Sequence, residues 1–96
     1  MKVIALLLTL TVLIITSTAQ AQDAGRGGQL FSSCVECHGQ NAGGIEGKGP
    51  VLAGQYDWYI LTSLKDYKSG ARKHPKAQGL SEQDMKDLAA HISRLK

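Results

Sequence analysis

The pentapeptide Cys34-Val35-Glu36-Cys37-His38 carries the strongest chemical signal in this 96-residue chain. Two thiols separated by two residues can each form a thioether with one vinyl group of a haem, and the imidazole that follows can bind the iron. We therefore predict a covalent haem site, with Cys34 and Cys37 as the thioether anchors and His38 as the proximal iron ligand.

Paired cysteines also occur in zinc sites, dithiol redox centres and structural disulfides, and three features favour haem over these. The histidine follows the second cysteine immediately, the chain has no other cysteine, and an apolar leader precedes the motif. The remaining histidines, His74 and His91, lie too far away to complete a zinc site at short spacing. A thioredoxin-like dithiol centre requires alternating strands and helices, for which the sequence has no pattern. A structural disulfide and a dithiol are the remaining alternatives.

Residues 1–21 have the three zones of a signal peptide. They begin with the positive charge of Lys2, continue with an apolar run over 3–15 and end in Ala19-Gln20-Ala21, with small residues on either side of the glutamine. We predict cleavage before Gln22 and export of the mature chain. The apolar run, about thirteen residues, is shorter than the roughly twenty needed to cross a bilayer, so a retained anchor is the weaker alternative.

Removal of this leader would leave residues 22–96 as one domain without a membrane span. The whole chain carries eleven basic and eight acidic side chains, a formal net charge of +3, and loss of Lys2 leaves the balance only slightly positive. Such a mild excess does not argue for nucleic acid as a partner. A domain of this length buries little apolar surface by itself, and a covalently held macrocycle would offset that deficit.

Three stretches of the mature chain have helical patterns that would pack around this haem. Residues 25–33 predict a short helix that leads into the cysteine motif. Residues 56–68 have apolar positions at helical spacing and are followed by a capping glycine, Gly70. Residues 80–95 predict an amphipathic closing helix with Ser81 as its N-cap. The fold class is therefore predicted to be all-α.

Several of these features together resemble the class I c-type cytochromes of the small bacterial branch. Gly27, Leu30 and Phe31, followed by the cysteine motif, are similar to the first helix of that family, in which the glycine lies where the first and last helices cross. The segments 59–72 and 80–90 are similar to its middle and last helices. The resemblance implies a small cytochrome c fold with three main helices around one haem. It also implies a periplasmic one-electron carrier for redox partner proteins, not an enzyme.

The resemblance also suggests a role for the proline that follows the glycine-rich loop predicted over 39–49. In the family, the carbonyl of this proline accepts the Nδ1 hydrogen of the iron-bound imidazole. Pro50 would then hold His38 in one orientation; the alternative is that it simply closes a turn. For the haem propionates, the Trp58 indole or the Arg72 guanidinium is a possible donor, although core packing is the simpler expectation for the aromatic residues of this helix.

The sequence departs from the family in the loop between the middle and last helices. Most members carry there the methionine that is the sixth iron ligand, whereas residues 73–79 are short and contain no methionine. His74 is our tentative distal ligand, because it lies in this loop and an imidazole binds haem iron well. The alternatives are Met85, which we expect in the core, Lys73 or Lys76 after loss of a proton, His91, and an open or water-bound iron.

The sixth ligand decides which function the sequence predicts. Two imidazoles support one-electron transfer at a lower potential than an imidazole with a thioether, because sulfur favours ferrous iron. An open or weakly ligated site instead predicts a haem protein that binds small gases or peroxide. We expect the electron carrier, with the haem in a dry pocket and partners that dock transiently under the influence of lysine charges. We expect a monomer or a small subunit.

Overall fold

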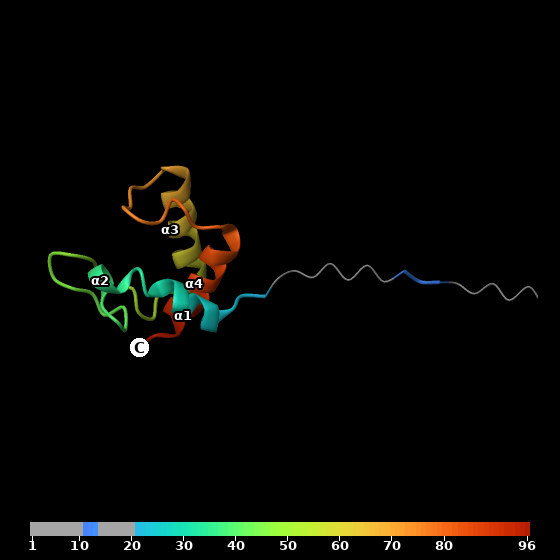
Figure 1. Cartoon of the computed structure of the whole chain (residues 1–96), viewed down its shortest axis with the longest axis horizontal. Helices are drawn as coiled ribbons and strands as arrows, with labels where there is room; N and C mark the ends of the chain where they lie inside the picture. The colour runs from blue at the N-terminus through green and yellow to red at the C-terminus, as the bar shows by residue number, and fades with distance from the viewer. Residues whose placement is uncertain (1–10, 14–20) are drawn as a thin grey trace, which may run out of the picture.

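The computed structural model describes residues 11–13 and 21–96, and the regular secondary structure within them is helical. The elements are α1 (Ala24–Phe31), the short α2 (Val35–His38), α3 (Asp57–Ser69) and α4 (Glu82–Arg94) (Figure 1). The expected all-α class with three main helices is confirmed, and residues 39–49 form the expected loop. The predicted signal peptide, residues 1–21, lies almost entirely outside the described residues.

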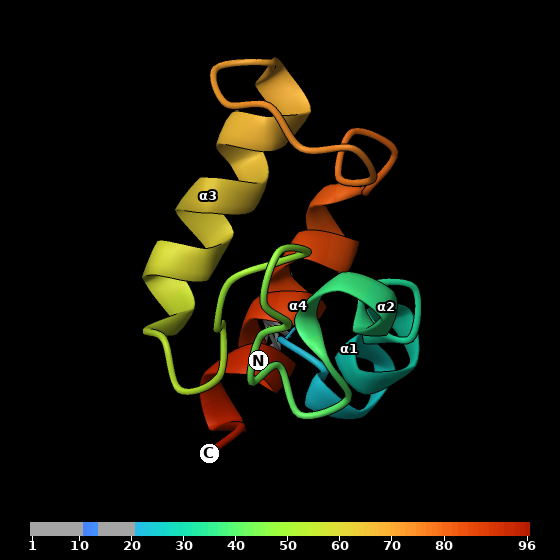
Figure 2. The same cartoon turned by 90° about the vertical axis from the view of Figure 1, so that its left-hand side faces the viewer.

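Helix α4 is the centre of the domain, because it packs against both α1 and α3. Figure 2 shows α3 on one side of the domain and α1 with α2 on the other, with α4 between them. The chain from Gly70 to Ser81 arches from the end of α3 to the start of α4, at the top of this view. The short helix that carries the cysteine motif therefore lies across the domain from α3.

Helices α1 and α4 cross at Gly27, where their backbones come very close. A Cβ atom at this position would lie 1.9 Å from the carbonyl oxygen of Asp87, far inside any allowed contact. Phe31 is buried beside the crossing, with its ring centre 5.6 Å from that of His91. The glycine thus lies at the helix crossing, as the resemblance implied, and His91 flanks this interface.

Gly27→Ala is expected to destabilise the domain by about 3 kcal/mol, because the added methyl group forces α1 away from α4. Gly25→Ala in the same helix is the matched control, since a Cβ there would meet the Asp23 carboxylate at an ordinary 3.4 Å. That change is expected to stabilise the helix by up to about 1 kcal/mol through helix propensity. Urea unfolding of both holoproteins measures the difference, and equal midpoints would contradict the close crossing.

A buried polar network fixes the same pair of helices. Asp87 on α4 is fully buried. Its carboxylate accepts three hydrogen bonds, from the backbone N–H of Asp23 (2.8 Å), the amide of Gln83 (2.8 Å) and the guanidinium of Arg26 (2.7 Å). Arg26 also pairs with Asp84 at 2.6 Å. Burial alone would raise the pKa of Asp87, but the three donors outweigh burial and hold the pKa below its ordinary value.

Acid is expected to weaken this network, because a carboxylate with a depressed pKa stabilises the fold only while it is ionised. The contribution of Asp87 is complete above its ordinary pKa of 3.8 and is lost as the pH falls through the lower folded-state pKa. Asp87→Asn should cost about 1–3 kcal/mol at neutral pH and flatten the acid limb of the stability curve. Thermal melts of both holoproteins from neutral to strongly acidic pH check this. If the melting temperatures of the two proteins fell in parallel as the pH fell, this would contradict an ionised Asp87.

The ends of the helices agree with the sequence expectations to within two residues. Ser81 caps α4 in a reciprocal arrangement: its hydroxyl accepts the Asp84 N–H at 3.0 Å, and the Asp84 carboxylate accepts the Ser81 N–H at 2.9 Å. Gly70 ends α3 in the left-handed conformation, with φ of 86°. Met85 on α4 is buried, which confirms its expected place in the core.

Core packing was the wrong expectation for the first aromatic residues of α3. Trp58 and Tyr59 are exposed, whereas Ile60 and Ser63 are the buried residues of this helix. The physical reason is the helical angle: Trp58 lies about 200° around the helix from Ile60 and so points away from the buried stripe. Only the stripe that continues from Ile60 through Tyr67 turns toward the interior.

Candidate functional site

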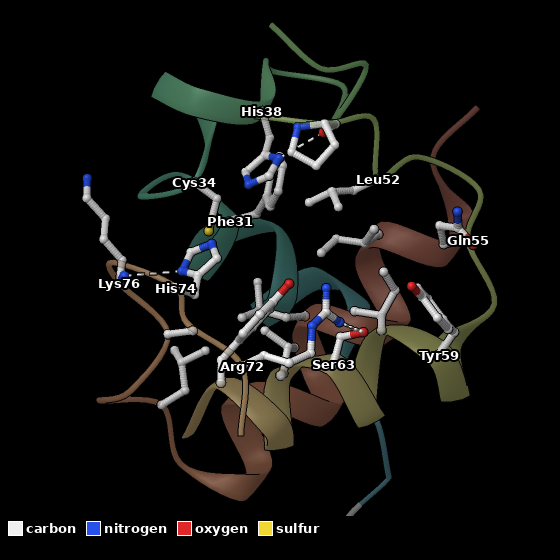
Figure 3. A pocket seen from close by; sticks show the side chains of 18 of the residues that line it. Phe31, Cys34, His38, Leu52, Gln55, Tyr59, Ser63, Arg72, His74 and Lys76 are labelled. Atoms are coloured by element: carbon white, nitrogen blue, oxygen red, sulfur yellow. Dashed lines mark hydrogen bonds between the residues drawn. The ribbon is translucent and has the colours of Figure 1, made fainter. Parts of the chain in front are cut away.

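A cavity of about 280 Å³ lies between α3 and the segment that carries α2. Phe31 from α1, Ile60 from α3 and Leu88 from α4 contribute to its walls. Figure 3 shows Phe31 among the side chains that surround it. The polar and charged residues on the walls are Ser33, His38, Gln55, Ser63, Arg72, His74 and Lys76. The cavity thus joins the cysteine motif, α3 and the loop before α4 in one largely apolar site.

His38 is the last residue of α2, and its buried side chain reaches the cavity. Its Nδ1 lies 2.9 Å from the carbonyl oxygen of Pro50. Because a carbonyl can only accept, Nδ1 carries the hydrogen, and the Nε2 lone pair is left free to bind a metal. Gly49 permits this approach, since a Cβ there would lie 2.6 Å from the Cys37 carbonyl oxygen. The Pro50 contact that the resemblance implied is therefore present.

Cys34 and Cys37 are both half-buried free thiols. Cys34 precedes α2 and lines the cavity, whereas Cys37 lies one turn later, next to His38, and is not among the lining residues. Burial raises the pKa of the Cys34 thiol, and its contact with the Ser33 hydroxyl offsets part of this rise. The structure thus brings both thiols and the imidazole together within one short helical segment.

His74 lies on the opposite side of the cavity from His38 and comes from the loop before α4. The two ring centres are 6.2 Å apart, and the ring planes differ by 7°. Figure 3 shows the two imidazoles with their edges directed toward one another. The Lys76 N–H donates to Nδ1 of His74 at 3.1 Å, so a neutral ring in this position carries its hydrogen on Nε2. Burial lowers the pKa of His74, and the nearby His38 lowers it further.

Tyr67 and Arg72 form the side of the cavity behind His74. The Tyr67 ring centre lies 4.9 Å from that of His74, and the Arg72 guanidinium carbon lies 4.8 Å from the Tyr67 ring centre. Arg72 also donates to the buried Ser63 hydroxyl at 3.1 Å. Of the two suggested propionate donors, Arg72 therefore lies in the cavity wall. Trp58 does not line the cavity.

Ser63 and Gln55 are cavity residues that the sequence analysis did not single out. Ser63 lies on the same face of α3 as Ile60 and Tyr67, at spacings of three and four residues. A hydroxyl on an otherwise apolar stripe was the signal that could have identified it. Gln55 lies in the loop before α3, where no periodic pattern marks a residue.

The fold and the cavity together define a class of protein. It is a small all-helical domain that is arranged around a cavity with thiol and imidazole groups. The sequence model of the family described as Cytochrome c matches residues 24–96, and the chain belongs to this family. It is 40% identical over 80 residues to cytochrome c-554(548) of Halomonas halodenitrificans, which covers 76% of this chain and 96% of the relative. It is 41% identical over 92 residues to cytochrome c-554(547) of Halothiobacillus neapolitanus, which covers 79% of this chain and 100% of the relative.

A solved structure shows the same fold. Cytochrome c4 of Acidithiobacillus ferrooxidans matches with a TM-score of 0.71 and 31% identity, over 79% of this chain and 52% of that chain. This chain thus spans about half the length of the solved relative. The expected small cytochrome c fold is confirmed, and the protein is a c-type cytochrome, an electron carrier with covalently bound haem c. Within residues 11–13 and 21–96, no helix has the length and apolar character that crossing a membrane requires.

The residues of the cavity fit this cofactor. The apolar walls suit the faces of a porphyrin, and His38 presents an Nε2 that is free to bind iron. Two free thiols lie on the same short segment. Arg72 and Ser63 supply hydrogen-bond donors of the kind that propionate groups require.

Proposed function

We propose that this protein is a periplasmic carrier of single electrons whose one haem is bound by four residues. Cys34 and Cys37 form the two thioethers, His38 is the proximal iron ligand and His74 is the distal one. The observation that carries this assignment is the His38–His74 pair, two imidazoles that face each other across an apolar cavity with nearly parallel planes. The protein then holds the iron in six-coordinate form and keeps water away from it.

The proximal assignment is supported by the tautomer of His38 and by its place in the chain. The Pro50 carbonyl keeps the hydrogen on Nδ1 and fixes the ring, which also makes Nε2 a better donor to iron. Cys34 and Cys37 precede this ring within one short segment, so all three bonds act from the same side of the site. Haem held in this way supplies a one-electron iron couple. The chain needs no catalytic acid or base for this, and we assign it no enzymatic activity.

The distal assignment is supported by the separation of the two rings. Metal–nitrogen bonds of about 2.0–2.1 Å place the centres of two imidazoles on opposite sides of one metal atom roughly 6 Å apart. The observed separation of 6.2 Å agrees with this value. To bind through Nε2, the His74 ring must move its hydrogen to Nδ1 and release the Lys76 N–H. Loss of one such hydrogen bond costs about 1 kcal/mol, which is small beside a coordinate bond.

The other candidates for the sixth position lie where they are poor ligands. Met85 is buried on α4 and His91 contacts Phe31 at the α1–α4 crossing, and neither is among the residues that line the cavity. Lys73 is exposed and does not line it either. Lys76 reaches the wall, but its ammonium lies 3.9 Å from the Glu36 carboxylate and would have to give up its proton and this partner. His74 is the candidate with both the chemistry and the place.

Export is part of the proposal. Residues 1–21 would act as the signal peptide and residues 22–96 as the mature cytochrome c domain. The positive start, the apolar run and the small residues before Gln22 support this division. Intact-mass measurement of the protein purified from the periplasm should give the mass of the chain from Gln22 plus one haem. A retained leader would contradict the cleavage site.

Redox partners would dock where the cavity opens to solvent. The segment 68–76 carries four basic side chains and no acidic one, and two of its members, Arg72 and Lys76, line the cavity. A positive edge of this kind steers an acidic partner toward the haem, and the effect weakens as salt is added. In such transient encounters the carrier acts as a monomer or as a small subunit of a larger complex.

Optical spectra of the purified holoprotein, oxidised and then reduced, test the proposal. We expect a low-spin six-coordinate spectrum in both states and no change when carbon monoxide is added to the reduced protein. The haem should stay on the chain after acid denaturation, because thioethers survive it. A high-spin ferrous form that binds carbon monoxide readily would overturn the electron-carrier assignment with His74 as ligand.

A second function is favoured by the hydrogen bond at His74. While the Lys76 N–H occupies Nδ1, the Nε2 of His74 carries a hydrogen and cannot bind iron. If this state persisted in the holoprotein, the distal side would be open or weakly ligated. The protein would then bind small gases or peroxide, and the carbon monoxide experiment decides between the two functions.

A further inference from the structure

A cluster of exposed aromatic side chains lies before and within the first turn of α3. Tyr56, Trp58 and Tyr59 are 71%, 63% and 44% exposed, and nearby Val51 is 60% exposed. We call these four residues the aromatic patch. Within residues 21–96, no other large hydrophobic side chain is counted among the exposed ones. Single exposed apolar residues are ordinary on soluble proteins, but a cluster that contains all of them marks a surface for contact.

The rings of the patch lie against one another. Tyr56 and Trp58 lie nearly parallel, with their ring centres 6.1 Å apart and a 14° angle between the planes. Trp58 and Tyr59 meet edge to face at 6.0 Å. The three rings thus form one continuous apolar surface.

The aromatic patch borders the haem cavity. Val51 and Tyr59 belong both to the patch and to the cavity wall, and Figure 3 shows Tyr59 beside Gln55 on one side of the site. Whatever covers the patch therefore also lies against the mouth of the cavity.

We propose that the aromatic patch binds the same patch of a second copy of this chain, so that two haem cavities lie side by side. Electron transfer between the two copies would rest on the proposed function, whereas the pairing of the two chains does not. The patch carries no basic side chain, which favours a second copy over the acidic partners that would dock at 68–76.

Charge supports this choice of occupant. From Gly49 to Leu64 the chain carries one ionisable side chain that is charged at neutral pH, Asp57, whereas the chain as a whole has a formal net charge of +3. The Asp57 carboxylate accepts the backbone N–H of Trp58 at 2.7 Å, so its charge is directed to the start of its own helix. Two positively charged molecules can therefore meet at this face without opposing like charges directly.

The area of the patch determines how strong the pairing is. An aromatic side chain buries about 150–250 Å² when fully covered, so three rings at these exposures offer on the order of 350 Å² per copy. The total for two copies, roughly 700 Å², is below the roughly 1,200 Å² at which stable interfaces begin. The pair is therefore weak and reversible and forms at high protein concentration.

Sedimentation velocity of the holoprotein over a concentration series, at low salt and at high salt, tests the pairing. We expect the mean mass to rise with concentration toward twice that of the monomer. Added salt should strengthen the association, because it screens the repulsion between two positive molecules and leaves apolar contact intact. The double variant Tyr56→Ser with Trp58→Ser should stay monomeric under all conditions. Thr62→Ser, an exposed change on the same helix outside the patch, should behave as the wild type.

Three outcomes would overturn the proposal. The wild type could remain monomeric throughout the series, or the double variant could pair as well as the wild type. The holoprotein could also stay monomeric and instead bind neutral phosphatidylcholine vesicles through Trp58, which would identify the patch as a membrane-surface contact. The optical spectrum of the double variant must equal that of the wild type, so that loss of pairing is separated from any loss of iron ligation. Failure of the pairing would leave the electron-carrier proposal untouched.

Discussion

His74→Ala is expected to change the iron from a low-spin six-coordinate to a high-spin or water-bound form. The reduced variant should then bind carbon monoxide to saturation under conditions that leave the wild type unchanged. The reason is geometric: His74 is the imidazole that faces His38 across the cavity, at 6.2 Å between ring centres. Optical spectra of the oxidised, reduced and carbon monoxide-treated variant measure both effects.

His74→Met extends this test to the reduction potential. A thioether favours ferrous iron relative to an imidazole, so the midpoint potential should rise, by roughly 0.1 V or more within the approximately 0.8 V range that axial ligands control. The side chain of methionine is long enough and flexible enough to reach the position of the imidazole edge. Potentiometric titration of the two proteins measures the shift.

Lys73→Ala is the matched control for both changes at His74. It alters the same loop next to His74 but removes a side chain that is exposed and does not line the cavity. Its spectrum and potential should stay close to those of the wild type. A Soret band and a potential that do not change in His74→Ala would contradict distal ligation by this residue. The Met85→Leu variant would then be the next to examine, since that residue has the other suitable side chain.

The helices of this fold could be predicted from sequence because their signals are local. The Ser81 cap and the Gly70 end need only neighbouring residues, and both appear where the pattern placed them. The crossing at Gly27 depends on contact with a helix some sixty residues later. It was therefore predicted from the resemblance to the family and not from the local sequence pattern. Trp58 was misplaced because an aromatic residue at helical spacing indicates burial only where a neighbouring element covers that face.

The candidate site could be predicted in part for the same reason. The cysteine motif is contiguous in sequence, so its three chemical groups must lie close together wherever the chain folds. The relation of His74 to His38 depends instead on the path of a loop that carries no periodic pattern. The hydrogen bond from Lys76 to His74, which decides the tautomer, joins residues only two apart but depends on that loop conformation. The place of Ser63 in the site depends on its hydrogen bond from Arg72, a contact that no sequence pattern indicates.

Replacement of both motif cysteines by alanine, Cys34→Ala with Cys37→Ala, is expected to abolish covalent haem and most of the stability of the domain. The cavity of about 280 Å³ is bounded by Phe31, Ile60 and Leu88, which are also members of the hydrophobic core. Without haem, the apolar side chains of these walls are exposed to water, and the stabilisation that comes from their burial against the macrocycle is lost. The haem is therefore expected to act as part of the core.

Intact-mass spectrometry and far-ultraviolet circular dichroism of the double variant measure the two effects. We expect the mass of the bare mature chain, with low helix content and no cooperative melting transition. Each single variant should keep one thioether and an intermediate stability, and Ser33→Ala, beside the motif, should still carry covalent haem. A haem-free double variant that melts cooperatively with native helix content would contradict this expectation. The α1–α4 contact, with Gly27 at its crossing and Asp87 in its polar network, would then be sufficient to hold the domain together.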